Sequence, residues 1–207
     1  MIDERFTARF WDERYSSASR IWTGDPNPQL VSEAGALDPG TALDAGCGEG
    51  GDAHWLARRG WQVTAVDVSD VALERGAAHA EPDVTGKIDW QCADLTTWMP
   101  DRAFDLVNAQ FMHFPQALRE PFFARLAAAV SPAGTLLIVG HHPSDMQTTM
   151  PRPPEPDLFF TAEEIADSLD TEQWDVLTAA ARPRPAHDPE GREVTIHDAV
   201  LRARRRP

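Results

Sequence analysis

The 207-residue sequence predicts an α/β fold: a seven-stranded, mostly parallel sheet with helices on both faces and an antiparallel hairpin formed by the last two strands. Three observations predict it. Short apolar runs that end in an acid alternate with helical patterns, a glycine-rich turn follows the first run, and two further apolar segments close the chain. Strands that alternate with helices are typical of parallel sheets, because parallel neighbours need a crossover connection.

The first half of the chain predicts helix and strand in turn. A helix is expected over 7–15, and a second begins at Pro28, with Asn27 as its cap and proline in its first turn. The strand from Thr41 leads through the glycine-rich turn into a helix over 50–59. A strand over 62–67 and a helix capped by Ser69, which runs to about His79, follow it.

The second half continues the alternation. Strands are expected from Ile88, from Phe104 and over 134–140, with a helix over about 115–130 between the last two. Segment 141–158 is too rich in proline for a regular element and is long enough to be a lid. Thr161-Ala-Glu-Glu is a capping box that starts a helix through Ser168. Segments 174–181 and 193–203 are the predicted hairpin strands.

The glycine-rich turn is the most informative stretch of the sequence. Asp44, Gly46, Gly48 and Gly50 stand at every second position after the first strand, so the backbone can fold tightly and approach a ligand without interfering Cβ atoms. The helix that follows offers free N–H groups and a positive dipole end to a polar ligand. On its own such a turn is a weak signal, since glycines also end strands and helices.

A second acid strengthens the interpretation. Asp67 ends the next strand, 23 residues after Asp44, where a carboxylate can accept both hydroxyls of a ribose. A dinucleotide oxidoreductase places its first glycine directly after the strand, whereas here an acid precedes that glycine by two residues. A nucleotide-like cofactor is therefore expected.

These motifs resemble the class I S-adenosylmethionine-dependent methyltransferases, whose first motif is an acid followed by Gly-x-Gly-x-Gly. Asp94, after the third strand, matches the family acid that holds the adenine amino group, and Phe104–His113 matches the strand-four segment that lines the methyl-transfer site. The resemblance covers about residues 38–205 and implies a Rossmann-like core. It also implies S-adenosyl-L-methionine as cofactor and S-adenosyl-L-homocysteine as product.

The resemblance implies a set of cofactor-binding residues. Asp67 is expected at the ribose, Asp94 at the adenine edge, and the glycine turn at the methionine end of the cofactor. Cys47 fits as a small side chain within that turn rather than as a reactive thiol. The full set comprises Trp11, Trp22, Asp44, Gly46, Cys47, Gly48, Asp67, Val68, Asp94, Leu95, Asn108, Ala109 and Gln110.

The aromatic N-terminal segment has two interpretations. Phe6 and Phe10 suit a helix that packs on the sheet. Small bacterial detoxifying methyltransferases, similar to the tellurite-resistance and thiol types, fold such a segment over the cofactor, where Trp11, Tyr15 or Trp22 could face the sulfonium. We therefore expect one methyltransferase domain over 1–207, with a helical cap over 1–36 and a Rossmann-like core over 37–207.

Three histidines are the candidate catalytic residues, because each follows a strand at the edge of the sheet where ligands bind. His113 follows strand four, and His141 and His142 follow strand five. Each could face the acceptor as a general base with a pKa near neutrality, or as a shape and hydrogen-bond element. The alternatives are a core role for His113 and ordinary loop roles for the other two. No metal is expected, because adjacent histidines point in different directions and no carboxylate completes a ligand set.

Composition limits the partners. A net charge of −14 argues against nucleic acid, which requires a basic face, and no apolar run approaches the length needed to cross a membrane. Two cysteines and no visible signal peptide favour a reducing cytoplasm. The expected partner is a small-molecule methyl acceptor, and the protein is expected to be a monomer or homodimer.

The predicted activity is direct methyl transfer to an oxygen, nitrogen or sulfur acceptor, whose identity the sequence leaves open. Alternatives are a non-catalytic S-adenosylmethionine-binding module, a nicotinamide-dependent oxidoreductase, and an RNA or protein methyltransferase.

Overall fold

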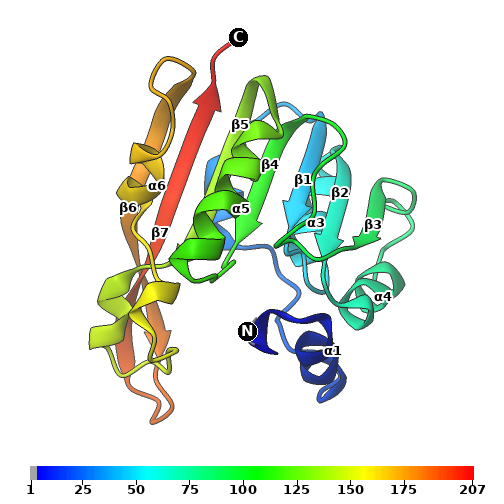
Figure 1. Ribbon diagram of the computed structural model, residues 1–207. Helices are drawn as coiled ribbons and strands as arrows, with labels where there is room; N and C mark the ends of the chain where they lie inside the picture. The colour runs from blue at the N-terminus through cyan, green and yellow to red at the C-terminus, as the bar shows by residue number, and fades with distance from the viewer. Residues whose placement is uncertain (1–3) are drawn as a thin grey trace.

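The computed structural model describes residues 4–207 and contains one seven-stranded sheet with the strand order β3-β2-β1-β4-β5-β7-β6 (Figure 1). The strands β1 to β5 pair in parallel, and β7 pairs antiparallel with both β5 and β6, which confirms the predicted fold class. Their bounds are β1 Thr41–Ala45, β2 Gln62–Asp67, β3 Ile88–Cys92, β4 Phe104–Gln110, β5 Val130–His141, β6 Trp174–His187 and β7 Glu193–Arg205.

Helices cover both faces of the sheet, with two hydrophobic cores as a result. Leu30, Leu56 and Leu106 belong to the core that α2 and α3 cover, and Phe122 and Phe160 belong to the core beside α5 and α6. The bounds are α1 Ala8–Ser16, α2 Pro28–Ala34, α3 Gly51–Arg58, α4 Asp70–Ala78, α5 Gln116–Ala128 and α6 Ala162–Asp167, with 3₁₀ turns η1 Glu4–Phe6, η2 Pro143–Gln147 and η3 Pro156–Leu158.

The predicted helix caps are confirmed. Asn27 Oδ1 accepts a hydrogen bond from Gln29 N at 2.8 Å, and Ser69 Oγ accepts one from Ala72 N at 3.2 Å. Thr161 and Glu164 form both hydrogen bonds of a capping box. Since each side chain satisfies an N–H group that lacks a partner within its helix, these caps fix where α2, α4 and α6 begin.

Three predicted boundaries differ from the structure. β5 begins at Val130 rather than at residue 134, and β6 and β7 run on to His187 and Arg205. The β6 extension contains Pro183 and Pro185, which are tolerated because β6 is an edge strand and needs N–H donors on one side only.

Segment 141–158 is also more regular than predicted. His141 is the last residue of β5 rather than a loop residue, and the short turns η2 and η3 form within the segment. Pro143 and Pro156 stand in the first positions of those turns, where the fixed φ of proline favours a helical start.

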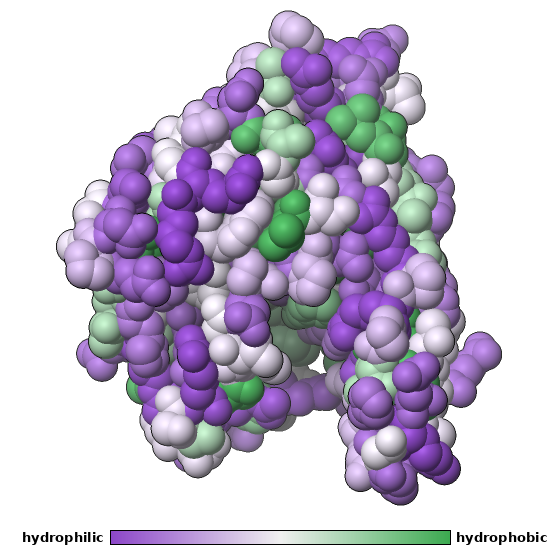
Figure 2. Space-filling view, turned by 180° about the vertical axis from the view of Figure 1, so that it is seen from behind, coloured by the Kyte–Doolittle hydropathy of each residue, from purple (hydrophilic) through white to green (hydrophobic). Residues whose placement is uncertain are grey.

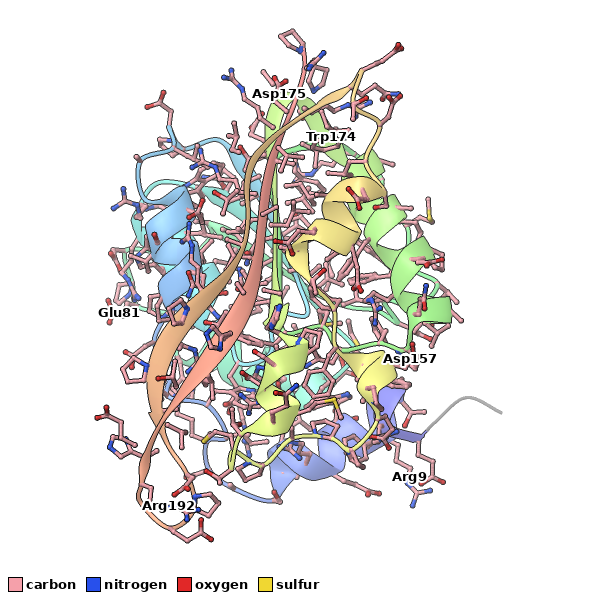
Figure 3. All side chains as sticks on the ribbon, turned by 90° about the vertical axis from the view of Figure 1, so that its left-hand side faces the viewer. Arg9, Glu81, Asp157, Trp174, Asp175 and Arg192 are labelled. Carbon is pink, nitrogen blue, oxygen red and sulfur yellow. The ribbon has the colours of Figure 1, made fainter. Side chains whose placement is uncertain are left out.

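One end of the sheet gathers the elements of interest. The strands β1, β2 and β4 end there, and α1 lies beyond their carboxyl ends (Figure 1). Arg192, in the β6–β7 turn, and Arg9, on α1, lie at this same end, whereas Trp174 and Asp175 lie at the other (Figure 3). From behind, a notch separates two lobes at this end (Figure 2). Of the predicted N-terminal cap, residues 1–3 lie outside the described part of the chain.

Membrane-spanning helices are absent from residues 4–207, because none of the helices there is both long and apolar enough.

Candidate functional site

The glycine turn adopts backbone conformations that only glycine accepts readily. Gly46 and Gly48 have φ values of 78° and 52°, and the N–H of Gly46 donates to Val66 O of β2 at 2.8 Å. A Cβ at Gly46 would overlap Met112 Sδ, and a Cβ at Gly48 would lie 2.8 Å from the Tyr15 hydroxyl oxygen. The glycines therefore allow both the tight turn and the close approach of other groups.

Asp44, the last residue but one of β1, has one carboxylate oxygen without a hydrogen-bond partner in the described chain. Oδ1 accepts a hydrogen bond from Asn108 Nδ2 at 2.9 Å, across the register of β1 and β4. Oδ2 is buried and has no hydrogen-bond partner within residues 4–207. Burial, and then the neighbouring charge of Asp52, raise the pKa of Asp44 well above its ordinary value. A cationic ligand would provide a partner for Oδ2 and would stabilise the charged form of Asp44.

Asp67 ends β2 and fixes the glycine turn. Its Oδ2 accepts a hydrogen bond from Gly48 N at 2.8 Å, and its Oδ1 accepts one from Ser69 N at 3.0 Å. The side chain is only 7% exposed, and burial raises the pKa of its carboxyl group. Each oxygen keeps a second lone pair, which a sugar hydroxyl could use.

Asp94 lies two residues beyond β3, whose last residue, Cys92, is opposite Asp67 in the parallel register. It is exposed, and its Oδ1 accepts hydrogen bonds from the N–H and hydroxyl of Thr96 at 2.8 and 2.6 Å. Leu95 is buried beside it. The carbonyl oxygen of Val68, the residue after Asp67, accepts a hydrogen bond from Cys92 Sγ. The acids after β2 and β3 thus lie on neighbouring strands at one end of the sheet.

Most polar side-chain atoms at the end of β4 are already hydrogen-bonded to one another or to Asp44. Asn108 is fully buried, donates to Asp44, and accepts a hydrogen bond from Gln110 Nε2 through Oδ1. Ala109 is buried as well. Gln110 Oε1 is buried and lacks a hydrogen-bond partner in the described chain. It is the second unsatisfied acceptor at this end of the sheet.

Aromatic residues of the N-terminal segment lie against the glycine turn. Tyr15 is 3% exposed, and its hydroxyl oxygen accepts a hydrogen bond from Trp22 Nε1 at 3.1 Å. The rings of Trp11 and Tyr15 lie 5.9 Å apart, and Trp22 is half exposed. Cys47, within the turn, is partly buried, and burial raises the pKa of its thiol well above the ordinary value. As predicted, Phe6 packs on the core, with its ring 5.4 Å from that of Phe114, whereas the ring of Phe10 lies 5.6 Å from that of Trp11 and is in neither core cluster.

Three acidic residues that the sequence analysis missed hold this segment in place. Glu49 and Asp52, in and after the glycine turn, accept hydrogen bonds from the backbone of residues 21–27. Asp12 Oδ1 accepts a hydrogen bond from Ser69 Oγ at 2.6 Å. A glutamate inside a glycine turn next to a buried strand was the available signal, because burial of such a charge requires specific partners.

The structure brings two of the three candidate histidines together. His113 and His141 stack with their ring centroids 4.6 Å apart, and His141 N donates to His113 Nε2 at 3.0 Å. Burial lowers the pKa of His113 to about 4 and that of His141 to about 2. The expected near-neutral pKa is therefore wrong for both, and each imidazole is neutral at pH 7. Buried His141 Nδ1 has no hydrogen-bond partner among residues 4–207.

His142 points elsewhere. Its Nδ1 lies 2.9 Å from Ser144 Oγ, which in turn lies 3.4 Å from His197 Nδ1. These contacts fix the start of η2 against β7. The expectation that adjacent histidines point in different directions is confirmed.

A groove of about 1160 Å³ opens elsewhere, between α5 and α6. Phe123, Ile165 and Trp174 contribute to its lining, which contains none of the predicted site residues. The candidate site is thus defined by the strand ends and the glycine turn.

Comparison with known proteins agrees with this geometry. Residues 42–134 match a family model described as a methyltransferase domain. The chain is 29% identical over 133 residues to a probable thiol methyltransferase 2 of Arabidopsis thaliana, which covers 61% of this chain and 59% of that protein. The chain therefore spans less than two thirds of this relative's length.

Solved structures share the fold over nearly the whole chain. TehB from Haemophilus influenzae superposes with a TM-score of 0.72 at 18% identity, over 95% of this chain and 67% of that one. A SAM-dependent methyltransferase from Anabaena variabilis gives 0.68 at 19% identity, over 96% and 93% of the two chains. Residues 42–134 are therefore similar to a methyltransferase domain, and the chain as a whole has the fold of the S-adenosylmethionine-dependent methyltransferases.

Proposed function

We propose that this protein is an S-adenosylmethionine-dependent methyltransferase that acts on a small molecule. The observation that carries the proposal is Asp44 Oδ2, a buried carboxylate oxygen without a partner in the described chain, at the end of β1 and beside the glycine turn. The ammonium group of the cofactor's methionine end would satisfy that oxygen and compensate the buried charge.

The residues present fit the cofactor in its other parts. Asp67 is proposed to accept the ribose hydroxyls and Asp94 the adenine amino group, with Val68 and Leu95 flanking the base. Gly46, Cys47 and Gly48 provide the close backbone approach. Asn108, Ala109 and Gln110 are proposed to contact the ammonium through backbone carbonyl oxygens and Gln110 Oε1, since the Asn108 side chain is already engaged.

Charge supports the same fit. Asp44, Asp52 and Asp67 lie close enough that Asp52 and Asp67 both raise the pKa of Asp44, and burial raises the pKa of Asp52 to about 6. Like charges in a poorly hydrated site destabilise one another. A ligand that carries both an ammonium and a sulfonium group reduces this repulsion, which favours the S-adenosylmethionine site over a dinucleotide site.

Bound S-adenosylmethionine supplies an electrophilic methyl group on a positively charged sulfur. This chain's residues align the acceptor with it and exclude water. The N-terminal segment, which we propose as a cap over 1–36 of a single domain, brings Tyr15 and Trp22 to the glycine turn, with Trp11 beside Tyr15. The notch at this end gives an acceptor a route between the two lobes (Figure 2).

The histidines point to the class of acceptor. His113 Nε2 already accepts a backbone hydrogen bond, and the low pKa values of His113 and His141 make both weak bases. An acceptor that ionises by itself, such as a thiol, needs no strong base. We therefore propose a thiol or a similarly acidic small molecule, with His141 Nδ1 orienting it and His142 acting through the position of η2.

A transfer assay tests this function. The purified protein is incubated with methyl-labelled S-adenosylmethionine and a panel of thiols, phenols, heterocyclic N-hydroxides and amines. Labelled methyl thioether is the expected product, formed faster at higher pH as more thiolate is present. Cofactor binding without transfer to any acceptor would favour the non-catalytic module.

A further inference from the structure

Glu49 is a buried carboxylate that the proposed cofactor contacts do not use. It stands between two glycines of the turn and is 3% exposed. Its Oε2 accepts hydrogen bonds from the backbone N–H groups of Ile21 and Trp22, at 3.2 and 3.4 Å. A glutamate that sits inside the glycine turn thus holds a loop that lies 27 to 28 residues earlier in the sequence.

A second carboxylate holds the same loop one helical turn further on. Asp52 Oδ1 accepts a hydrogen bond from Asn27 N at 2.6 Å. Between the two acids the loop lies directly on α3, because a Cβ at Gly51 would come 2.9 Å from the carbonyl oxygen of Asp25. Residues 21–27, here called the latch loop, are therefore fastened at both ends to the turn.

Arg75 of α4 completes the arrangement. Its Nη1 donates to Glu49 Oε1 at 3.3 Å and to the carbonyl oxygen of Tyr15, in the last turn of α1, at 2.7 Å. Tyr15 and Trp22 are joined by their own hydrogen bond at 3.1 Å. Glu49 and Arg75 together connect the end of α1, the latch loop and the glycine turn.

The latch loop is held by these polar contacts more than by apolar packing. In α1 the one buried residue is Tyr15, and Trp22 remains 49% exposed. Segments that bury few apolar side chains open at a far lower free energy than the whole domain. Breaking the hydrogen bonds to Glu49 is thus one of the costs of lifting this segment away from the turn.

We propose that Glu49 is a positioning residue that latches the N-terminal segment over the cofactor and sets the rate of cofactor release. The proposal rests on the proposed function. Hydrogen bonds to a charged acceptor are stronger than those to a neutral one, so loss of the Glu49 charge should accelerate release by about tenfold. Cofactor entry should accelerate as well, because the segment must open in either protein before the cofactor enters.

The test compares E49Q, which keeps the size of the side chain but removes its charge, with wild type. Glu13, which is exposed on α1 and pairs with Arg9, provides the control E13Q. Stopped-flow tryptophan fluorescence gives the dissociation rate of S-adenosylhomocysteine. Amide hydrogen exchange reports on Ile21 and Trp22 without cofactor. I21P removes one of the loop's two N–H donors to Glu49 while leaving Glu49 intact, and so tests the latch if E49Q does not fold.

We expect E49Q to release S-adenosylhomocysteine about tenfold faster, to bind it faster as well, and to exchange both amides faster. E13Q should match wild type. Unchanged release in E49Q or I21P, with the wild type still binding S-adenosylhomocysteine, would overturn the latch alone. No binding by wild type would instead overturn the proposed function, and the release role of Glu49 with it.

Discussion

The N–H of Gly48 donates a hydrogen bond to Asp67 Oδ2 at 2.8 Å, so the middle of the glycine turn is fastened to the end of β2. The same carboxylate is the proposed ribose ligand. Asp67 therefore has two functions, one in shaping the turn and one in binding, and its replacement tests both.

Replacement of Asp67 by alanine should weaken S-adenosylmethionine binding by at least about 1 kcal/mol, because charge-assisted hydrogen bonds of about 1.5 to 3 kcal/mol each are lost. Calorimetric titration measures the change. D83A, in an exposed loop, is the matched control. Equal affinity in D67A and wild type would remove the ribose assignment.

Asp44 should show opposite effects on stability and on binding. Asparagine keeps the oxygen that pairs with Asn108 and removes a buried charge, so D44N should raise the free energy of unfolding without cofactor by about 1 kcal/mol. Because the folded-state pKa of Asp44 is raised, wild type loses stability as pH rises above the ordinary carboxyl range, and D44N should lose less.

The same variant should bind S-adenosylmethionine at least about tenfold more weakly, through loss of the ammonium partner. Urea unfolding and calorimetry give the two quantities. Stability and affinity that both stay at the wild-type level would contradict the role of Asp44 Oδ2.

The lowered pKa of His113 predicts that the stability of the protein depends on pH. Its pKa is about 4 in the folded protein and about 6.5 in an unfolded chain, so between these values the unfolded state binds more protons. Stability therefore rises with pH from about 4 to 6.5. The glutamine in H113Q can still accept a hydrogen bond from His141 N but does not titrate. The free energy of unfolding of H113Q should therefore rise over this pH range by about 1 to 3 kcal/mol less than that of wild type.

Urea unfolding at pH 4.5 and pH 6.5 measures this difference. H187Q, at an exposed position of β6, should retain the wild-type slope. Parallel slopes in H113Q and wild type would mean that His113 is not held neutral by burial.

The candidate histidines should separate by kinetics. Replacement of His141 by phenylalanine keeps the stack on His113 but removes Nδ1, so turnover should fall several-fold with little change in cofactor affinity. Substitution H142A should have a smaller effect, since His142 contacts Ser144 and not His113. Steady-state assays with the acceptor found by the screen measure both. A larger loss in H142A would reverse these roles.

Local chemistry explains which parts of the fold the sequence could predict. The caps at Asn27, Ser69 and Thr161 depend on a side chain and an N–H two or three residues later, so short-range pattern suffices. The extension of β6 through Arg-Pro-Arg-Pro depends on its edge position, which only the assembled sheet defines. Proline therefore misled the boundary prediction.

The candidate site also has parts that the sequence could predict and parts that it could not. Asp44 and Asp67 follow from strand ends and spacing, because parallel strands bring their carboxyl ends together. The stack of His113 on His141, and the hydrogen bonds of Glu49 to residues 21 and 22, join segments 28 positions apart or nearly so. These contacts form only when the chain is packed in three dimensions. The sequence alone therefore could not predict the lowered pKa values of His113 and His141 or the hydrogen bonds that Glu49 accepts.

Isothermal titration calorimetry of the wild-type chain with S-adenosylhomocysteine tests the central claim most directly, with D44N and NADH as comparisons. One site per chain, a weaker interaction in D44N and no heat with NADH are the predicted results. Binding of NADH without binding of S-adenosylhomocysteine would contradict the account.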